Sequence, residues 1–307
     1  MVPGARRVRA AMREYRRAHR GNLLKTPKRL EALVHEGMID GVVRQLMSGK
    51  EATVYVVRCG EELRCAKVYK EAHKRAFRQA ALYQEGRKTK NSREARAMAK
   101  GTRFGRQAQE EAWQSVEVDT LYLLAAAGVR VPKPYGFMHG VVLMELLTDA
   151  EGHAAPRLND LDLPEALALE YHAVLIRQIV RMLCAGIIHG DLSEYNVLVD
   201  RGGPVIIDLP QAVNAAGNNN AAAMLQRDAG NITHYFSRFA PALAATQYGK
   251  EIWARYERGA LHADADLTGH FATSTAPVDV RGVMREISDV RKEHEARERY
   301  KAELEGR

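Results

Sequence analysis

Short runs of β-branched and aliphatic residues alternate with polar residues through the region 41–69, and this pattern predicts a small β-sheet. Val42 and Val43, then Thr53 to Val57, then Leu63 to Tyr69 have the composition of short strands separated by glycine-containing turns. Cys59-Gly60, followed by two glutamates, supplies the turn of a hairpin between the second and third strands. The first half of the chain is therefore expected to be rich in β-structure.

Helical spacing of apolar residues begins further along the chain. Residues 113–127 are rich in Leu and Ala and are followed by Gly128, which predicts a helix that ends there. A longer helix is expected from Pro164 to Ala185, because proline is favoured in a first helical turn and Gly186 follows. A third helical stretch is expected over residues 221–258. The second half of the chain should therefore be mainly helical.

Extended segments lie between these helices. The prolines within Val129 to Pro134 favour extended backbone. The compact apolar run Gly140 to Leu147 is typical of a buried strand. Two further apolar runs, Asn196 to Val199 and Val205 to Ile207, are separated by a short segment with two glycines, which predicts a hairpin.

This order of elements predicts an α+β fold with two lobes and a nucleotide cleft between them. We expect a basic helical extension over residues 1–40 and a small β-rich N-lobe over 41–146. A mainly helical C-lobe should follow over 147–262, and a charged tail helix over 263–307.

Composition places the chain among ordinary globular proteins. Of its 307 residues, 46% are hydrophobic and 27% are charged. No apolar run approaches the roughly 18 to 20 residues of a membrane helix, and none resembles a secretory signal. The three cysteines are not in metal-ligand spacing and suit a reducing compartment. We therefore expect a cytoplasmic protein with no membrane partner.

The net charge of +8 is unevenly distributed. Residues 1–30 contain ten Lys or Arg against one acid, and residues 70–106 contain twelve against three acids. Such segments attract polyanions, including nucleotides, RNA and acidic protein surfaces. A solvated basic face without a partner explains the charge equally well, and no aromatic-rich RNA-binding signature accompanies it.

The most specific polar motif is His189-Gly-Asp-Leu-Ser-Glu-Tyr-Asn196. Asp191 precedes Asn196 by five positions, the interval of the protein-kinase catalytic loop His-Arg-Asp-x-x-x-x-Asn. The predicted hairpin then returns Asp208 beside Asn196. Phosphoryl transfer needs a carboxylate at the attacking hydroxyl and oxygen ligands for Mg²⁺, and these three side chains supply both. An Asp-rich turn with a capping Asn is the structural alternative.

A candidate phosphate loop lies between the first two predicted strands, at Ser48-Gly-Lys-Glu-Ala-Thr-Val-Tyr55. Gly49 permits close approach of the backbone, and Ser48 and Lys50 offer hydrogen-bond donors. The segment is neither the Gly-x-Gly-x-x-Gly loop of most protein kinases nor a Walker loop. Taken alone, it fits an ordinary hairpin turn equally well.

Lys67 follows Ala66 on the third predicted strand, as does the kinase lysine that neutralises the α- and β-phosphates of ATP. Such a lysine needs an acidic partner on the following helix. Glu117 is favoured because it shares a helix face with Trp113 and Leu121. The candidates considered are Glu110, Glu111, Glu117 and Asp119.

Taken together, these motifs resemble those of the RIO family of atypical serine/threonine kinases, over about Gly41 to Phe239. The pairing of Gly-Lys-Glu-Ala-x-Val-Tyr with Asp-Leu-Ser-Glu-Tyr-Asn is highly specific for that family. The resembling segments, in order, are Gly49–Tyr55, Ala66–Lys70, Trp113 with Glu117, Gly128–Pro134, His189–Asn196 and Ile207–Asp208. The resemblance implies a two-lobed protein-kinase-like fold of RIO type.

The resemblance also implies roles for individual residues, with ATP as substrate and Mg²⁺ or Mn²⁺ as cofactor. The expected set is Asp191 as catalytic carboxylate, Asn196 and Asp208 as metal ligands, Lys67 and Glu117 as the phosphate-orienting pair, Ser48, Gly49 and Lys50 as phosphate loop, and Met144, Glu145 and Leu146 as the segment beside adenine. From sequence alone, Met144 is simply a core residue.

RIO proteins resemble protein kinases that lack the activation segment, and no Ala-Pro-Glu follows Asp208 in this chain. Members autophosphorylate on serine, and some act chiefly as ATPases through phosphorylation of the metal-binding aspartate. Eukaryotic and archaeal relatives assist maturation of the small ribosomal subunit. The chain departs from close relatives at Leu209–Ala212 and at Gly217–Asn220, and its Ala- and Arg-rich composition suggests a bacterial member.

Three functions follow from these observations. The first is a serine/threonine protein kinase whose substrates include itself. The second is an ATPase switch that gates binding to RNA or a ribosomal particle through the basic segments. The third is a small-molecule phosphotransferase, against which the basic charge of the chain argues, since such enzymes usually carry an acidic helical insert for cationic substrates.

Overall fold

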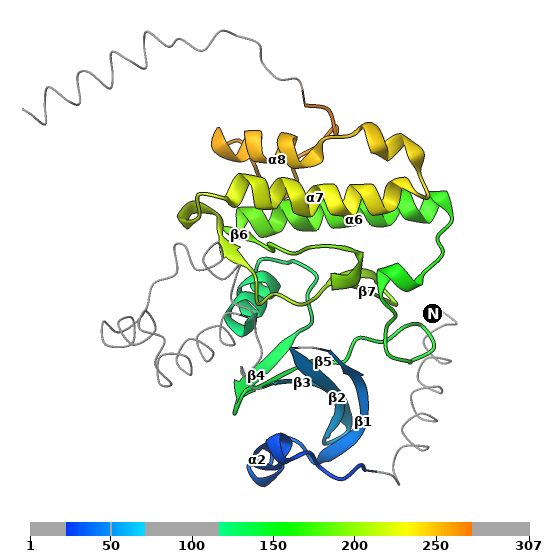
Figure 1. The fold of residues 1–307 in the computed structure, drawn as a ribbon, viewed down its shortest axis with the longest axis vertical. Helices are drawn as coiled ribbons and strands as arrows, with labels where there is room; N and C mark the ends of the chain where they lie inside the picture. Colours follow the sequence, from blue (N-terminus) through cyan, green and yellow to red (C-terminus); the bar gives the residue numbers. More distant parts are fainter. Residues whose placement is uncertain (1–22, 50, 71–116, 272–307) are drawn as a thin grey trace, which may run out of the picture. The chain divides into compact units, whose positions relative to one another are not determined.

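The structure is a computed structural model that describes residues 23–49, 51–70 and 117–271. An antiparallel sheet comes first in the chain and a set of helices follows it (Figure 1). The strands of the sheet are β1 (Gly41–Ser48), β2 (Ala52–Cys59), β3 (Glu62–Tyr69), β4 (Pro134–Met138) and β5 (Val141–Glu145). The longer helices are α6 (Glu165–Cys184), α7 (Ala221–Ser237) and α8 (Tyr248–Glu257).

The five strands pair in the order β1-β2-β3-β5-β4, and every neighbouring pair is antiparallel. The predicted hairpin between β2 and β3 is present, with Cys59 opposite Glu62. Strand β4 was not predicted, because Gly136 interrupts its apolar pattern and coincides with a shift in its register against β5. The turn that joins β4 to β5 has positive φ at both His139 and Gly140, as a type I′ turn requires.

The two faces of the sheet belong to different hydrophobic clusters, because side chains alternate along each strand. On β3, Ala66 and Val68 face a cluster that contains Leu30 and Leu33. Tyr69 faces the other way and packs with the helix at 117–126. Lys67 lies between Ala66 and Val68, so its side chain points to the same face as Tyr69. This alternation aims Lys67 at that helix.

Residues 23–40 are less helical than the sequence predicted. The described helices there are a 3₁₀ turn, Lys28–Leu30, and α2 (Glu31–His35). The amide of Leu24 donates a hydrogen bond of 2.8 Å to the carbonyl of Val42, which extends the pairing at β1. Residues 1–22 lie outside the described chain, as does most of the basic segment 70–106.

In the helical region, α7 packs against both α6 and α8, and the three lie side by side (Figure 1). The predicted bounds of α6 are confirmed to within one residue at each end. The stretch 221–258 is not continuously helical: α7 ends at Ser237, and Pro241 opens a separate 3₁₀ turn before α8. Within the described chain, no helix is both long enough and apolar enough to span a bilayer.

Small hairpins complete the helical region. Strands β6 (Ile187–Ile188) and β9 (Val213–Asn214) pair, as do β7 (Val197–Asp200) and β8 (Gly203–Ile206). The β7–β8 pair is the predicted hairpin. The tail helix that was predicted from about residue 280 lies outside the described residues. Before that point, Thr268 and Gly269 donate backbone hydrogen bonds to the buried carboxylate of Glu251, which ties residues near 268 to α8.

Candidate active site

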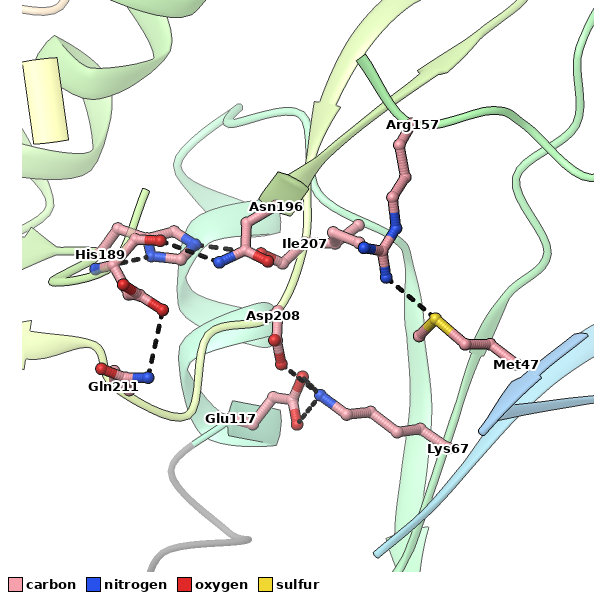
Figure 2. A network of polar contacts seen from close by, with 10 residues as sticks. Met47, Lys67, Glu117, Arg157, His189, Asn196, Ile207, Asp208 and Gln211 are labelled. Carbon is pink, nitrogen blue, oxygen red and sulfur yellow. Dashed lines mark hydrogen bonds and ion pairs between the residues drawn. The ribbon is translucent and has the colours of Figure 1, made fainter. Parts of the chain in front are cut away.

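Lys67 and two carboxylates form the centre of the candidate site (Figure 2). The ammonium group of Lys67, on β3, donates to both oxygens of Glu117 at 2.8 and 3.0 Å. It also donates to Oδ1 of Asp208 at 2.6 Å. The predicted pair of Lys67 with Glu117 is therefore present. The ammonium group of Lys67 thus contacts two carboxylates that lie 50 and 141 residues further along the chain.

The electrostatic balance of this cluster keeps Lys67 charged. Burial alone would lower the pKa of Lys67, but Glu117 and Asp208 outweigh it and raise the pKa above its usual value. Burial would raise the pKa of Asp208, yet Lys67 holds it below the usual value, with smaller contributions from His189 and Arg157. Glu117 is 2% exposed and Asp208 is 44% exposed. Asp208 thus remains ionised and open on one side.

The β7–β8 hairpin positions Asp208 as the sequence predicted. The amide of Ile207 donates to the carbonyl of Asn196 at 3.0 Å, which sets Asp208 next to Asn196. A ring nitrogen of His189 lies 3.0 Å from the carbonyl oxygen of Ile207. Asp208 itself has φ of 66°, a left-handed conformation that non-glycine residues rarely adopt. Backbone strain of this kind is concentrated at functional sites.

The loop that carries Asp191 is fixed from several sides. The amide group of Asn196 donates to the backbone carbonyl of Asp191 at 2.9 Å. Gln211 donates from Nε2 to Oδ2 of Asp191 at 3.2 Å (Figure 2). Partial loss of hydration is the main cause that raises the pKa of Asp191, against the opposing effects of His189 and Arg227. A carboxylate with a raised pKa accepts a proton more readily.

Asp228 was missed by the sequence analysis. Its buried carboxylate, on α7, accepts backbone hydrogen bonds from Gly190 at 2.8 Å and from Leu192 at 3.1 Å. These amides lie on either side of Asp191, so Asp228 holds the backbone of the loop. Gly190 has φ of 83°, which explains a glycine between His189 and Asp191. A lone Asp within a helical pattern gave no sequence signal for this contact.

The segment that was predicted as a phosphate loop lies between β1, which ends at Ser48, and β2, which begins at Ala52. The amide of Gly49 donates to the carbonyl of Ala52 at 2.9 Å. Lys70 donates to Oγ of Ser48 at 3.0 Å and to the carbonyl of Gly49 at 2.6 Å. Lys50, the third residue predicted for this loop, lies outside the described residues. Lys70 was not predicted to contact the turn.

Met144, Glu145 and Leu146 were predicted to lie beside adenine. Met144 is on β5 and packs against the larger hydrophobic cluster. The strand ends at Glu145, whose amide donates to the carbonyl of Lys133 at 2.8 Å. Leu146 follows directly and is half-buried. The segment therefore leads from the sheet to the helical region, and its predicted contact with adenine stays a prediction.

The oxygen atoms at and near Asp208 are suitable ligands for a magnesium ion. Mg²⁺ prefers oxygen ligands and usually binds through one or two carboxylates together with waters and substrate phosphates. Oδ1 of Asp208 bonds Lys67, and the exposed part of the carboxylate is available to a cation. The side-chain NH₂ group of Asn196 donates to the backbone carbonyl of Asp191, so the side-chain oxygen of Asn196 could serve as a metal ligand. Across the described residues, no cluster of three His, Cys, Asp or Glu offers a different metal site.

Comparison with known proteins agrees with this geometry. The model of the RIO domain matches residues 53–248, which include Lys67, Asp191 and Asp208. The chain is 35% identical to the RIO-type serine/threonine-protein kinase Rio1 of Haloferax volcanii over 208 residues, which are 67% of each chain. It is 30% identical to the serine/threonine-protein kinase rio1 of Schizosaccharomyces pombe over 244 residues.

The match to the yeast relative covers 77% of this chain but only 46% of that protein. This chain thus spans about half the length of that relative. Among solved structures, it is similar to the kinase domain of Mycobacterium tuberculosis PknI, with 14% identity and a TM-score of 0.40. That similarity covers 67% of this chain and 83% of the other.

Proposed function

The chain belongs to the RIO family of atypical serine/threonine protein kinases, and from this premise we propose that it transfers the γ-phosphoryl group of Mg²⁺-bound ATP to serine hydroxyls, its own included. The single observation that carries this proposal is the contact of Lys67 with both Glu117 and Asp208. Protein kinases need a Lys–Glu pair for the phosphates and an Asp for the metal in the same place.

Each carboxylate at the site has a separate task in this proposal. Asp191 accepts the proton of the attacking hydroxyl and orients that hydroxyl toward the phosphorus. Glu117 is buried and holds Lys67 in position, so that the ammonium group meets the α- and β-phosphates. Asp208 and Asn196 would hold Mg²⁺, which when bound neutralises charge that builds up on the phosphate oxygens.

The remaining predicted residues would bind ATP away from the reacting atoms. Ser48, Gly49 and Lys50 would cover the phosphates from the β1–β2 turn. The backbone of Met144, Glu145 and Leu146 would bind the adenine edge where the chain leaves β5, although the amide of Glu145 already donates to the carbonyl of Lys133. Charge complementarity supports this division, because the phosphates would lie near Lys67 and Lys70.

An ATPase switch that gates binding to RNA or a ribosomal particle is the alternative proposal. Its partner would bind the basic segments 1–30 and 70–106, most of which lie outside the described residues. Phosphorylation of Asp208 itself would be its chemical signature. The exposed side of that carboxylate makes it accessible to a phosphoryl group.

The test is to incubate the pure protein with Mg²⁺ and γ-labelled ATP and to locate the label. We expect acid-stable phosphoserine in the wild type, and a loss of labelling of about 10²-fold or more in Asp191→Asn and in Asp208→Asn. Asp264→Asn is the matched control, because Asp264 is 81% exposed and pairs only loosely with Arg181 at 3.5 Å. It should label as the wild type does.

The form of the label separates the two proposals. A hydroxylamine-labile label that is lost with Asp208→Asn, together with slow release of phosphate, would establish the ATPase switch and contradict the kinase proposal. Neither label nor ATP turnover in the wild type would contradict both.

A further inference from the structure

Arg157 is a residue near the candidate site for which neither the sequence motifs nor the proposed reaction has a use. It lies before the 3₁₀ turn Leu158–Asp160. Figure 2 shows its side chain running toward Met47 near the end of β1. Its charge also acts on Asp208, whose pKa it helps to lower.

The hydrogen bonding of Arg157 is poor for an arginine. Its one side-chain hydrogen bond within the described chain is from Nη2 to the sulfur of Met47, at 2.9 Å. A thioether is a weak acceptor, whereas a guanidinium carries five N–H donors. Arg130 provides the contrast: it donates to both oxygens of Asp200 at 2.6 and 2.7 Å and to the carbonyl of Gly202 at 2.6 Å. Arg157 is half-buried, and among the residues that the structure describes it has no carboxylate or carbonyl partner of this kind.

The backbone at Arg157 is held firmly beside the proposed metal ligands. Arg157 forms a β-bridge with Leu198 on β7, the strand that begins directly after Asn196. The amide of Val199 donates to the carbonyl of Pro156 at 2.9 Å. The origin of the side chain is thus fixed to the same hairpin that positions Asp208. From there the side chain reaches Met47 on β1, where Nη2 donates to the sulfur.

The far end of the side chain reaches the candidate phosphate loop. Met47 directly precedes Ser48 and Gly49, and its own side chain is 42% exposed. The guanidinium therefore contacts the end of the strand that leads into the turn that would cover the phosphates. The effect of Arg157 on the pKa of Asp208 agrees with this placement, because it acts in the direction expected of a nearby cation.

We propose that Arg157 is a phosphate-binding residue that donates to the β- and γ-phosphate oxygens of ATP, exchanging its thioether contact with Met47 for charged acceptors. The inference rests on the proposed function, since it assumes that ATP occupies this site. Arginine matches phosphate geometry with two parallel N–H donors, which lysine cannot do. A thioether is a weak acceptor, whereas phosphate oxygens are anionic acceptors that pair well with a guanidinium, so the exchange favours the nucleotide-bound state.

The test measures the affinity of adenosine, AMP, ADP and ATP by calorimetry, for the wild type and for Arg157→Ala. We expect Arg157→Ala to lower the affinity for ATP and ADP by roughly 10- to 100-fold, because one or two hydrogen bonds to charged groups are lost. The affinity for AMP should fall less, and adenosine should bind as it does to the wild type. The ATP affinity of Arg157→Lys should lie between those of the wild type and Arg157→Ala, because lysine keeps the charge but not the two parallel N–H donors.

Two control variants identify the cause. Arg258→Ala removes an arginine directly after α8 whose Nε donates to the carbonyl of Ala254, and it should leave all four affinities unchanged. Met47→Leu removes the sulfur acceptor and should leave ATP affinity within about twofold, because that contact is given up on binding. A loss with Met47→Leu equal to that with Arg157→Ala would overturn the proposal.

Three further results would also overturn it. Unchanged ATP affinity in Arg157→Ala would show that the side chain does not meet the phosphates. An equal loss for adenosine and ATP would indicate damage to the site as a whole. Tighter ATP binding would show that Arg157 obstructs the site. A wild type that does not bind ATP would instead contradict the proposed function, and so the two failures can be told apart.

Discussion

At the scale of single residues, Asp191 depends on a neighbour that no motif identified. Gln211 donates to Oδ2 of Asp191, and Asn196 donates to its backbone carbonyl. The first contact restricts the rotation of the carboxylate, and the second fixes the backbone that carries it. A hydrogen bond to the charged form of a carboxylate also lowers its pKa, and Gln211 has this effect on Asp191. Gln211 is therefore a positioning residue in our proposal.

Gln211→Ala should reduce kcat by about three- to tenfold and leave the KM for ATP nearly unchanged, because positioning affects the reacting geometry more than nucleotide binding. The pKa of Asp191 should rise when the hydrogen bond is lost. If Asp191 acts as a base, the acidic limb of the pH profile of kcat should then move to higher pH. Initial rates over a range of pH values measure both effects.

Gln226→Ala on α7 is the control for that experiment, and it should reproduce the wild-type profile. A Gln211→Ala variant with a lower kcat but an unmoved acidic limb would argue that Gln211 acts on the fold of the loop rather than on the carboxylate of Asp191.

At the scale of elements, α6 and α7 are joined through a buried histidine. His172, on α6, is 2% exposed, and one of its ring nitrogens lies 3.0 Å from Oγ1 of Thr233 on α7. Its ring also contacts Phe236 on α7 and Tyr248 on α8. Burial lowers the pKa of His172 from 6.5 to about 4. The interface between these helices therefore requires the neutral imidazole.

This lowered pKa predicts how stability depends on pH. Since the pKa of His172 is lower in the folded state than in the unfolded state, protons favour unfolding between the two values. The contribution of the neutral His172 to the free energy of unfolding is complete above pH 6.5 and is lost as the pH falls toward 4. At pH 5 we expect a loss of at most about 2 kcal/mol in the free energy of unfolding. Urea unfolding at pH 7.5 and at pH 5 measures it.

His172→Gln is the matched variant, because glutamine retains a hydrogen-bonding group for Thr233 but does not titrate. Its stability should change less than that of the wild type over the same pH interval, even though it is lower at pH 7.5. An equal change in the two proteins would assign the pH dependence to other groups.

At the scale of the whole molecule, the sheet is covered by a segment that lies before the region matched by the RIO domain. Leu30 and Leu33 are 0% and 1% exposed and pack with Val57 and Ala66 on the sheet. The family match begins at residue 53. The kinase-like fold of this chain, a β-rich part followed by a helical part, therefore includes residues 23–40 in its hydrophobic packing.

Leu33→Ala should lower the free energy of unfolding by about 2 to 5 kcal/mol, because it removes buried methyl groups and leaves a cavity. Leu169→Ala is the control: Leu169 lies on α6 and is 41% exposed, so the cost should be within about 0.5 kcal/mol. Chemical denaturation of both variants supplies the comparison. Similar small losses in the two would mean that residues 23–40 do not stabilise the sheet.

The sequence by itself determined the elements whose signals are local. Alternation over residues 53–69 predicted the β2–β3 hairpin, and helical spacing predicted α6 to within one residue. The helix face shared with Trp113 and Leu121 predicted that Lys67 pairs with Glu117, and the hairpin pattern predicted that β7 and β8 return Asp208 beside Asn196. The catalytic and metal-binding roles of these residues stay proposals until the variants are measured.

Only the tertiary structure decided which side chains meet across long separations in sequence. Asp228 lies 36 to 38 residues along the chain from the two residues whose amides donate hydrogen bonds to it. Arg157 lies 110 residues from Met47, which its side chain contacts. Strand β4 was missed for a related reason, because its pairing with β5 compensates for a weak apolar pattern. Short periodicities are set by backbone geometry and are visible in any window of sequence. A contact between distant residues depends on how whole elements pack, and no local pattern specifies that packing.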